Sequence, residues 1–225
     1  MNARIGRAAG IAIVGVSVLL LAACEDTGPP SPLPATRDPN QPVTLSPTVY
    51  LLRPDQMAGY NRSGEKTLSA DAIASNDGDP SLAPHIQSQG LTYGTLYTYA
   101  PPSASPDSTP FREVISEAFI FTSSTGAESF LSDEKVRQNQ PPSKGGTIVP
   151  LTGAATTNTD ELTGFYATAP ESDQTTPPQS YLVLARRGRV VVELLAAGTV
   201  ENATRAQFDT LLGLQETLLA QSPDT

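Results

Sequence analysis

The 225-residue sequence has one cysteine, one histidine and no tryptophan. A single cysteine excludes an intrachain disulfide and any multi-cysteine zinc, haem or iron–sulfur site, and a single histidine excludes metal sites that need two. Charged residues make up only 16% of the chain, and 23 acidic against 14 basic side chains give a net charge of −9 at pH 7. Because phosphate contacts need clustered cations, this balance argues against nucleic-acid binding. We therefore expect no metal, no other cofactor and no nucleic-acid partner.

The first 23 residues have the pattern of an export leader. Arg4 and Arg7 make the start positive, and residues 8–23 form an uncharged, mostly apolar run that ends in small residues. This arrangement is typical of a secretory signal peptide. A transmembrane helix is the alternative, because the uncharged run is close to the shortest length that spans a bilayer. The basic start and the small residues at the end favour a signal peptide over residues 1–23.

The leader ends in Leu21-Ala22-Ala23-Cys24, which resembles the lipobox of bacterial lipoproteins. In that family the cysteine thiol receives diacylglycerol, signal peptidase II cleaves just before it, and in many bacteria the new amino terminus takes a further acyl chain such as palmitate. The resemblance implies that Cys24 is lipidated and that Leu21, Ala22 and Ala23 are recognised by the peptidase. Two or three acyl chains anchor a protein stably, so we expect attachment to the outer side of the cell membrane. An ordinary signal peptide with an incidental cysteine is the alternative.

Residues 24–47 are rich in proline and small polar side chains and contain little that could be buried. Such a segment favours extended polyproline II and cannot form a core, so we interpret it as a tether after the lipidated Cys24. A proline-rich docking motif is the alternative. The predicted organisation is a signal peptide over 1–23, the tether over 24–47 and one domain over 48–221.

Apolar periodicity predicts the elements of this domain. Helices are expected at 68–76, 80–89, 123–138 and 202–220, with caps at Ser69, Ser124 and Asn202. Strands are expected at 91–100, 111–122, 147–151, 162–168, 180–186 and 189–197, and a turn at 187–188 joins the last two. This order predicts an α+β fold, with a mostly antiparallel sheet packed against helices on one face and a C-terminal amphipathic helix.

Two apolar runs, Phe119-Ile120-Phe121 and Val190-Val191-Val192, belong to strands that we expect near the sheet centre. Together with the order of elements, these runs resemble the small extracytoplasmic α+β domains of bacterial lipoproteins and sensor proteins. The resemblance implies an extracytoplasmic domain and brings no catalytic motif with it.

Catalytic candidates are few. His85 is the only conventional general base near neutral pH, but no Gly-x-Ser-x-Gly motif is present and Cys24 lies at the tether, so we interpret His85 as a surface residue. The strand acids Glu113, Glu117 and Glu193 could pair as general acid and base in sugar cleavage. Alternating acids are more simply explained as the solvent-facing side of a sheet.

Two further clusters have ordinary explanations. The acids within residues 76–79 do not have the spacing of a twelve-residue calcium loop and are typical of a turn. The three arginines within residues 186–189 could contact a phosphate or an acidic partner, but a solvated hairpin turn accounts for them as well.

Tyr93, Tyr97 and Tyr99 alternate along the strand expected at 91–100 and therefore share one face. Their apolar rings and polar tips could line a groove for a ligand. The alternative is that they pack under the final helix. The sequence thus predicts a membrane-anchored envelope lipoprotein that is a non-catalytic module for an envelope protein or ligand. A small-ligand carrier using the tyrosine face, or a hydrolase using His85 or paired acids, is the alternative.

Overall fold

The structure is a computed structural model that describes residues 46–103, 109–139, 147–152, 159–168, 178–199 and 201–220. The predicted signal peptide, the lipobox residues Leu21, Ala22 and Ala23, and the lipidated Cys24 lie outside the described residues. In the part of the chain that is described, no helix combines the length and the apolar character that crossing a membrane requires.

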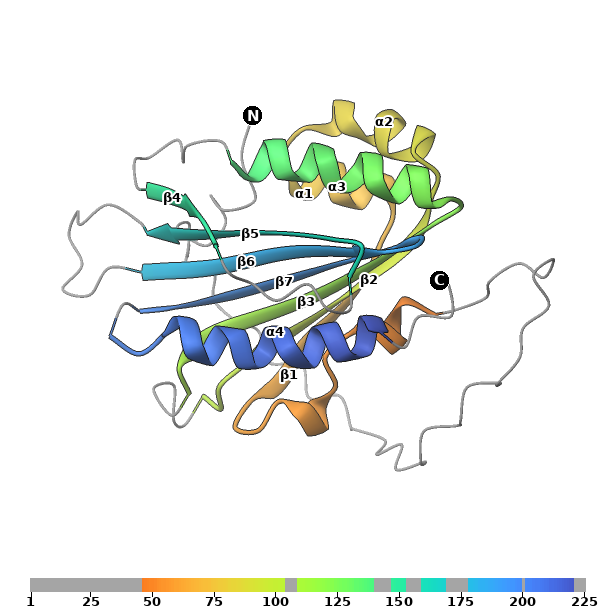
Figure 1. Cartoon of the computed structure of the whole chain (residues 1–225). Helices are drawn as coiled ribbons and strands as arrows, with labels where there is room; N and C mark the ends of the chain where they lie inside the picture. The colour runs from red at the N-terminus through yellow and green to blue at the C-terminus, as the bar shows by residue number, and fades with distance from the viewer. Residues whose placement is uncertain are drawn as a thin grey trace.

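Seven antiparallel strands form a single twisted sheet in the order β1-β2-β3-β7-β6-β5-β4 (Figure 1). Consecutive hairpins build both halves, and the β3–β7 pair joins them at the centre. The strands are β1 (Asn61–Leu68), β2 (Leu91–Ala100), β3 (Phe111–Phe121), β4 (Thr147–Pro150), β5 (Glu161–Thr168), β6 (Pro178–Arg187) and β7 (Val190–Thr199).

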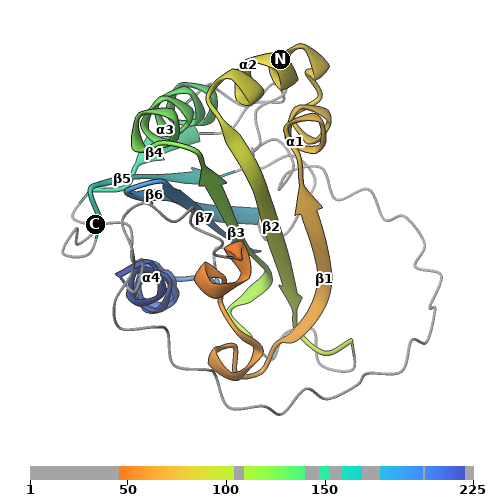
Figure 2. The same ribbon diagram turned by 90° about the vertical axis from the view of Figure 1, so that its right-hand side faces the viewer.

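Four α-helices and three 3₁₀ turns pack around this sheet. The helices are α1 (Ala70–Asn76), α2 (Ala83–Ser88), α3 (Ser124–Gln138) and α4 (Arg205–Ala220). The turns are η2 (Pro47–Tyr50), η3 (Pro54–Gln56) and η4 (Pro80–Leu82). Figures 1 and 2 show α4 apart from α1, α2 and α3, which gather together at one end of the molecule.

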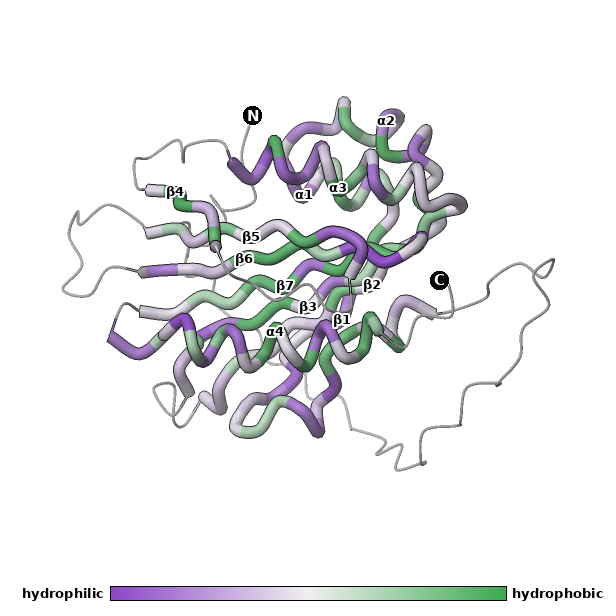
Figure 3. The backbone as a smooth tube through the Cα atoms, in the orientation of Figure 1, coloured by the Kyte–Doolittle hydropathy of each residue, from purple (hydrophilic) through white to green (hydrophobic). Residues whose placement is uncertain are grey.

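The helices cover both faces of the sheet. Val190 and Val192 of β7 share a core cluster with Phe208 of α4, and we call this side the first face. Val191, which points the opposite way, shares a cluster with Phe130 of α3, and we call this side the second face. The α+β class, the antiparallel sheet and the C-terminal helix are confirmed, but the expectation of helices on one face is wrong. A central strand that is apolar on both sides requires cover on both (Figure 3).

The predicted strands and helices are confirmed with shifts of a few residues at their ends. The strand predicted at 91–100 coincides with β2, and Ser69 caps α1 by accepting a hydrogen bond from the Ala72 N–H at 3.1 Å. The cap of α3 is Ser123 rather than Ser124, because Ser123 accepts from the Gly126 N–H at 3.0 Å.

Three local predictions need correction. The last helix begins at Arg205 rather than 202, and the Gln207 side chain accepts from the Thr204 N–H at its start. The β6–β7 hairpin turns at Gly188 and Arg189, one residue later than expected, with Gly188 at a φ of 54° that suits glycine. Strand β1 was not predicted, because it is an edge strand whose side chains are mostly exposed and polar.

Candidate functional site

The segment that directly follows the predicted tether is built into the core of the first face. We call residues 46–57 the strap; it contains η2 and η3 and precedes β1. Tyr50, Leu51, Leu52 and Met57 of the strap are all buried in the first-face cluster. Figure 2 shows this orange segment beside α4 and against β3. The folded domain therefore begins with a segment packed between the sheet and the last helix.

A buried hydrogen-bond network fixes the strap backbone to its surroundings. The Leu52 N–H donates to Ser116 Oγ at 3.1 Å, and the Ser116 hydroxyl donates to Gln215 Oε1 at 2.8 Å. The Gln215 amide nitrogen donates to the Tyr50 carbonyl, and the Tyr99 hydroxyl donates to the Leu52 carbonyl. Side chains from β2, β3 and α4 thus recognise main-chain groups of the strap. We call Tyr97, Tyr99, Ser116 and Gln215 the seat.

The seat contains polar groups where apolar ones would be expected. Ser116 is 0% exposed and Gln215 is 1% exposed, although they lie in a central strand and on the buried stripe of α4. A buried hydroxyl or amide destabilises a protein unless it is hydrogen-bonded, and the strap backbone satisfies both. Burial also raises the pKa of the Tyr99 phenol, so this group stays a neutral donor across the physiological range.

The predicted tyrosine face is occupied by the chain itself. Tyr97 and Tyr99 are buried, and Tyr93 is partly buried. The strap contacts Tyr99, and the Arg62 guanidinium lies 4.7 Å from the centre of the Tyr97 ring. The tyrosines therefore do not line an open groove. The strap, rather than the final helix alone, covers them.

Two of the three strand acids form a buried pair on the second face. Glu117 of β3 and Glu193 of β7 are direct cross-strand partners and are 3% and 4% exposed. The interpretation of a solvent-facing side is wrong for these two residues and holds for Glu113, which is exposed. They lie between the apolar cluster under α3 and a smaller cluster around Leu195. A sugar substrate would have to reach carboxylates that solvent barely reaches.

Charged residues at the ends of α1 and α3 join these helices. Arg137 pairs with the buried Glu134, its Nε lies 3.9 Å from Asp77 Oδ2, and the Gln138 amide nitrogen lies 3.4 Å from Glu134 Oε2. Asp79 accepts from the Ser81 N–H at 3.1 Å, and the two hydrogen bonds from Ser81 lower its pKa. These acids cap turns and pair helices. No group of three or more metal-ligating side chains occurs among the described residues.

His85 lies in a polar cluster between α2 and α3. Its Nε2 is 2.7 Å from Asp133 Oδ2, and its side chain is 54% exposed. The Gln89 amide nitrogen donates to Asp133 at 2.6 Å and to Ser129 Oγ at 3.1 Å. Ser129 therefore bonds Gln89 rather than the imidazole, and no serine or threonine hydroxyl of the described residues bonds the His85 ring. This arrangement connects two helices at the surface and lacks the nucleophile–base contact that a hydrolase needs.

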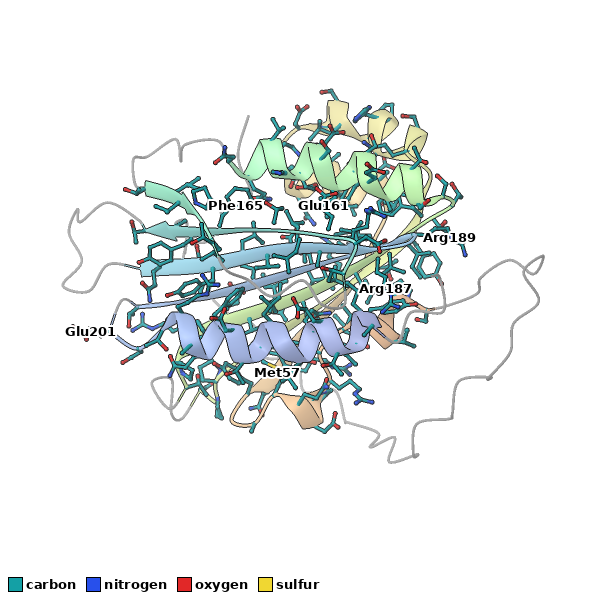
Figure 4. The ribbon with its side chains drawn as sticks, in the orientation of Figure 1. Met57, Glu161, Phe165, Arg187, Arg189 and Glu201 are labelled. Carbon is teal, nitrogen blue, oxygen red and sulfur yellow. The ribbon has the colours of Figure 1, made fainter. Side chains whose placement is uncertain are left out.

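The arginines at the β6–β7 turn are largely engaged within the domain. Arg186 Nη1 lies 3.2 Å from Asp160 Oδ2, and the same oxygen accepts from the Gly188 N–H at 2.7 Å. Arg187 donates to the Ala220 carbonyl at 2.7 Å, close to the end of α4, as Figure 4 shows. A cation at a helix C-terminus is favourable, so Arg187 stabilises the last turn of α4.

Ser116 and Gln215 were missed as functional residues. Gln215 lies within the apolar stripe predicted for the last helix, and Ser116 lies within an apolar strand. A polar residue inside an apolar stripe is the signal that could have identified them.

No protein-family model and no curated protein sequence matches this chain. Among solved structures, it is similar to the crystal structure of the extracellular domain of PknH from Mycobacterium tuberculosis, with 12% sequence identity and a TM-score of 0.49. The similarity covers 77% of this chain and 92% of that domain. At 12% identity, no residue role passes from that domain to this chain.

Proposed function

We propose that the protein is a lipid-tethered extracytoplasmic module that binds a partner and has no catalytic activity. The observation that carries this proposal is the strap. Directly after a proline-rich segment that leads from Cys24, the chain enters the core and is fixed by Ser116, Tyr99 and Gln215. A body that is held through its N-terminal end needs such a firm point of attachment.

The leader supports the membrane setting. Leu21-Ala22-Ala23-Cys24 follows an uncharged apolar run, as in lipoprotein precursors, and uses the only thiol of the chain. The net charge of −9 opposes docking of the domain on anionic headgroups, so the lipid and the tether would hold it away from the surface.

The absence of catalysis is supported by the geometry of the candidates. His85 contacts Asp133 and has no hydroxyl nucleophile on its ring within the described residues, while Glu117 and Glu193 are buried. The tyrosine face, which a small-ligand carrier would use, is filled by the strap. Binding of a partner protein therefore agrees best with the residues available.

Mass spectrometry of the protein from membranes of the producing cells tests the anchor. We expect an N-terminal peptide that begins at a diacylglycerol-modified Cys24. The Ala23→Gly variant, which keeps a small residue before the cysteine, should be processed in the same way, whereas Cys24→Ser should carry no lipid. An unmodified Cys24 in a chain that still contains Met1 would contradict the proposal.

Crosslinking in intact cells tests the binding role. The lipidated protein should form a reproducible adduct with one envelope protein, and the adduct should be lost when the domain is unfolded by a core substitution. Turnover of a substrate by the purified protein, abolished by His85→Ala without unfolding, would show that the protein is an enzyme instead.

A further inference from the structure

The strap is attached to the sheet only through side chains. No residue of the strap pairs with a strand, and the first ladder residue is Asn61. Within η2 the backbone bonds are local, from Leu51 N to Thr48 O at 3.3 Å and from Val49 N to Ser46 O at 3.2 Å. Lifting the strap therefore breaks no strand–strand hydrogen bond. A terminal segment with this connectivity can open as its own unit.

The floor under the strap tolerates water better than an apolar floor would. Ser116, Gln215 and the Tyr99 hydroxyl are satisfied by the strap backbone when it is seated. When the strap leaves, the same groups can bond to water, so the penalty of an unpaired buried polar group does not arise. Burial of the strap side chains favours the seated state, but ordering about a dozen terminal residues opposes it.

The seat has a defined chemical preference. It offers one acceptor to a backbone N–H and two donors to backbone carbonyls, and none of these contacts involves a strap side chain. The strap fills the adjoining space with an aromatic residue followed by two aliphatic ones, Tyr50, Leu51 and Leu52. The complementary ligand is thus a polypeptide segment with this backbone conformation and an aromatic–aliphatic sequence.

We propose that the strap is a latch, which leaves the seat while the sheet stays folded, and that the vacated seat binds an aromatic–aliphatic peptide segment of a partner protein. This inference deepens the proposed function and rests on it for the membrane setting. The strap is the part of the domain joined to the tether, so constraint at the anchor acts on it first. The anchored end and the binding surface are thereby linked.

Hydrogen exchange on the full processed chain tests the latch. The Leu52 amide should exchange at least ~100-fold faster than amides of the central strand β7, because it opens without global unfolding. Tyr99→Phe removes one hydroxyl and keeps the ring, so it should speed Leu52 exchange about fivefold and leave β7 unchanged. Ser129→Ala, which loses a hydrogen bond between Gln89 and α3, is the control and should leave Leu52 unaffected. Exchange of Leu52 at the rate of β7 would overturn the proposal.

A labelled synthetic peptide with the sequence of residues 46–57 tests the seat. Leu52→Ala weakens the strap and leaves every seat residue intact, so it should raise peptide affinity at least ~10-fold over the wild type. Leu68→Ala removes an equally buried leucine under the second face and should give no such gain. Equal binding of a scrambled peptide, or no gain with Leu52→Ala, would overturn the proposal. Neither readout depends on the lipid, so the latch and the membrane anchor can fail separately.

Discussion

The first face of the sheet buries Ser116 and Gln215, whereas the second face buries Glu117 and Glu193. On the first face the buried polar groups are neutral and are satisfied by a terminal segment of backbone. On the second side, charged residues join α1 to α3 through Arg137. Neutral groups can exchange a protein partner for water at modest cost, whereas a buried charge that loses its partner is strongly unfavourable. The comparison indicates an adaptable first face and a fixed second face.

Arg137→Met should give the largest effect, because it leaves the buried Glu134 without its cation and removes the positive charge near Asp77. Breaking a buried ion pair from one side costs about 3–5 kcal/mol in the free energy of unfolding. Lys135→Met, at an exposed position of the same helix, is the control and should change stability by less than about 0.5 kcal/mol. Equal values for the two variants in urea unfolding would remove the distinction between the faces.

Gln215→Leu should have a smaller effect, because it leaves the Ser116 hydroxyl and the Tyr50 carbonyl without their present partner. Loss of hydrogen bonds to buried neutral groups costs about 1–3 kcal/mol. Gln87→Leu, at an exposed position on α2, serves as the matched control. If the strap opens as a unit, the loss should appear mainly as faster exchange of strap amides. Equal acceleration throughout the sheet would show that both faces unfold together.

The pH dependence of stability should differ between Glu216 and Asp79. Burial raises the pKa of Glu216, whose folded form therefore holds a proton more tightly than the unfolded chain. Its contribution to stability is present below the ordinary glutamate pKa of 4.5 and is lost as the pH rises through the raised value. Glu216→Gln should thus stabilise the domain at neutral pH and give no advantage in acid, as thermal unfolding at several pH values would show.

Asp79 should show the opposite sign, because hydrogen bonds from Ser81 lower its pKa. Its contribution is present above the ordinary aspartate pKa of 3.8 and is lost as the pH falls through the lowered value. The Asp79→Asn variant should therefore differ from the wild type near neutrality and converge with it in acid. Profiles of the same sign for Glu216→Gln and Asp79→Asn would contradict both assignments.

Local patterns predicted those elements whose side chains are sorted by burial. Strand β2 alternates, β7 is apolar throughout, and α4 carries a regular stripe, so each was predicted from its own residues. Strand β1 carries no such pattern, because the sheet edge leaves its side chains in water. The need for helices on both faces was already present in the continuous apolar run of β7, but the one-face expectation did not use it.

The seat could not be predicted in the same way. Ser116 and Gln215 are 99 residues apart in the chain, and Gln215 and Tyr50 are 165 apart, so no local periodicity relates them. The tyrosine alternation correctly placed Tyr97 and Tyr99 on one face but contained no information about what covers it. Which segment closes a face depends on the folded topology, and here the first described residues of the domain do so.

His85→Ala should give the smallest effect and bears on the enzyme alternative. His85 and Asp133 form an exposed pair between α2 and α3, and such pairs contribute about 0–1 kcal/mol. Crosslinking to the partner and retention in the membrane should therefore be unchanged, with only a minor loss of stability in urea unfolding. Asp133→Asn, which keeps an oxygen acceptor for Gln89, should be closer still to the wild type. A folded His85→Ala protein that had lost a measurable activity would assign a chemical role to the α2–α3 surface, and the functional site would then belong to the second face rather than to the seat.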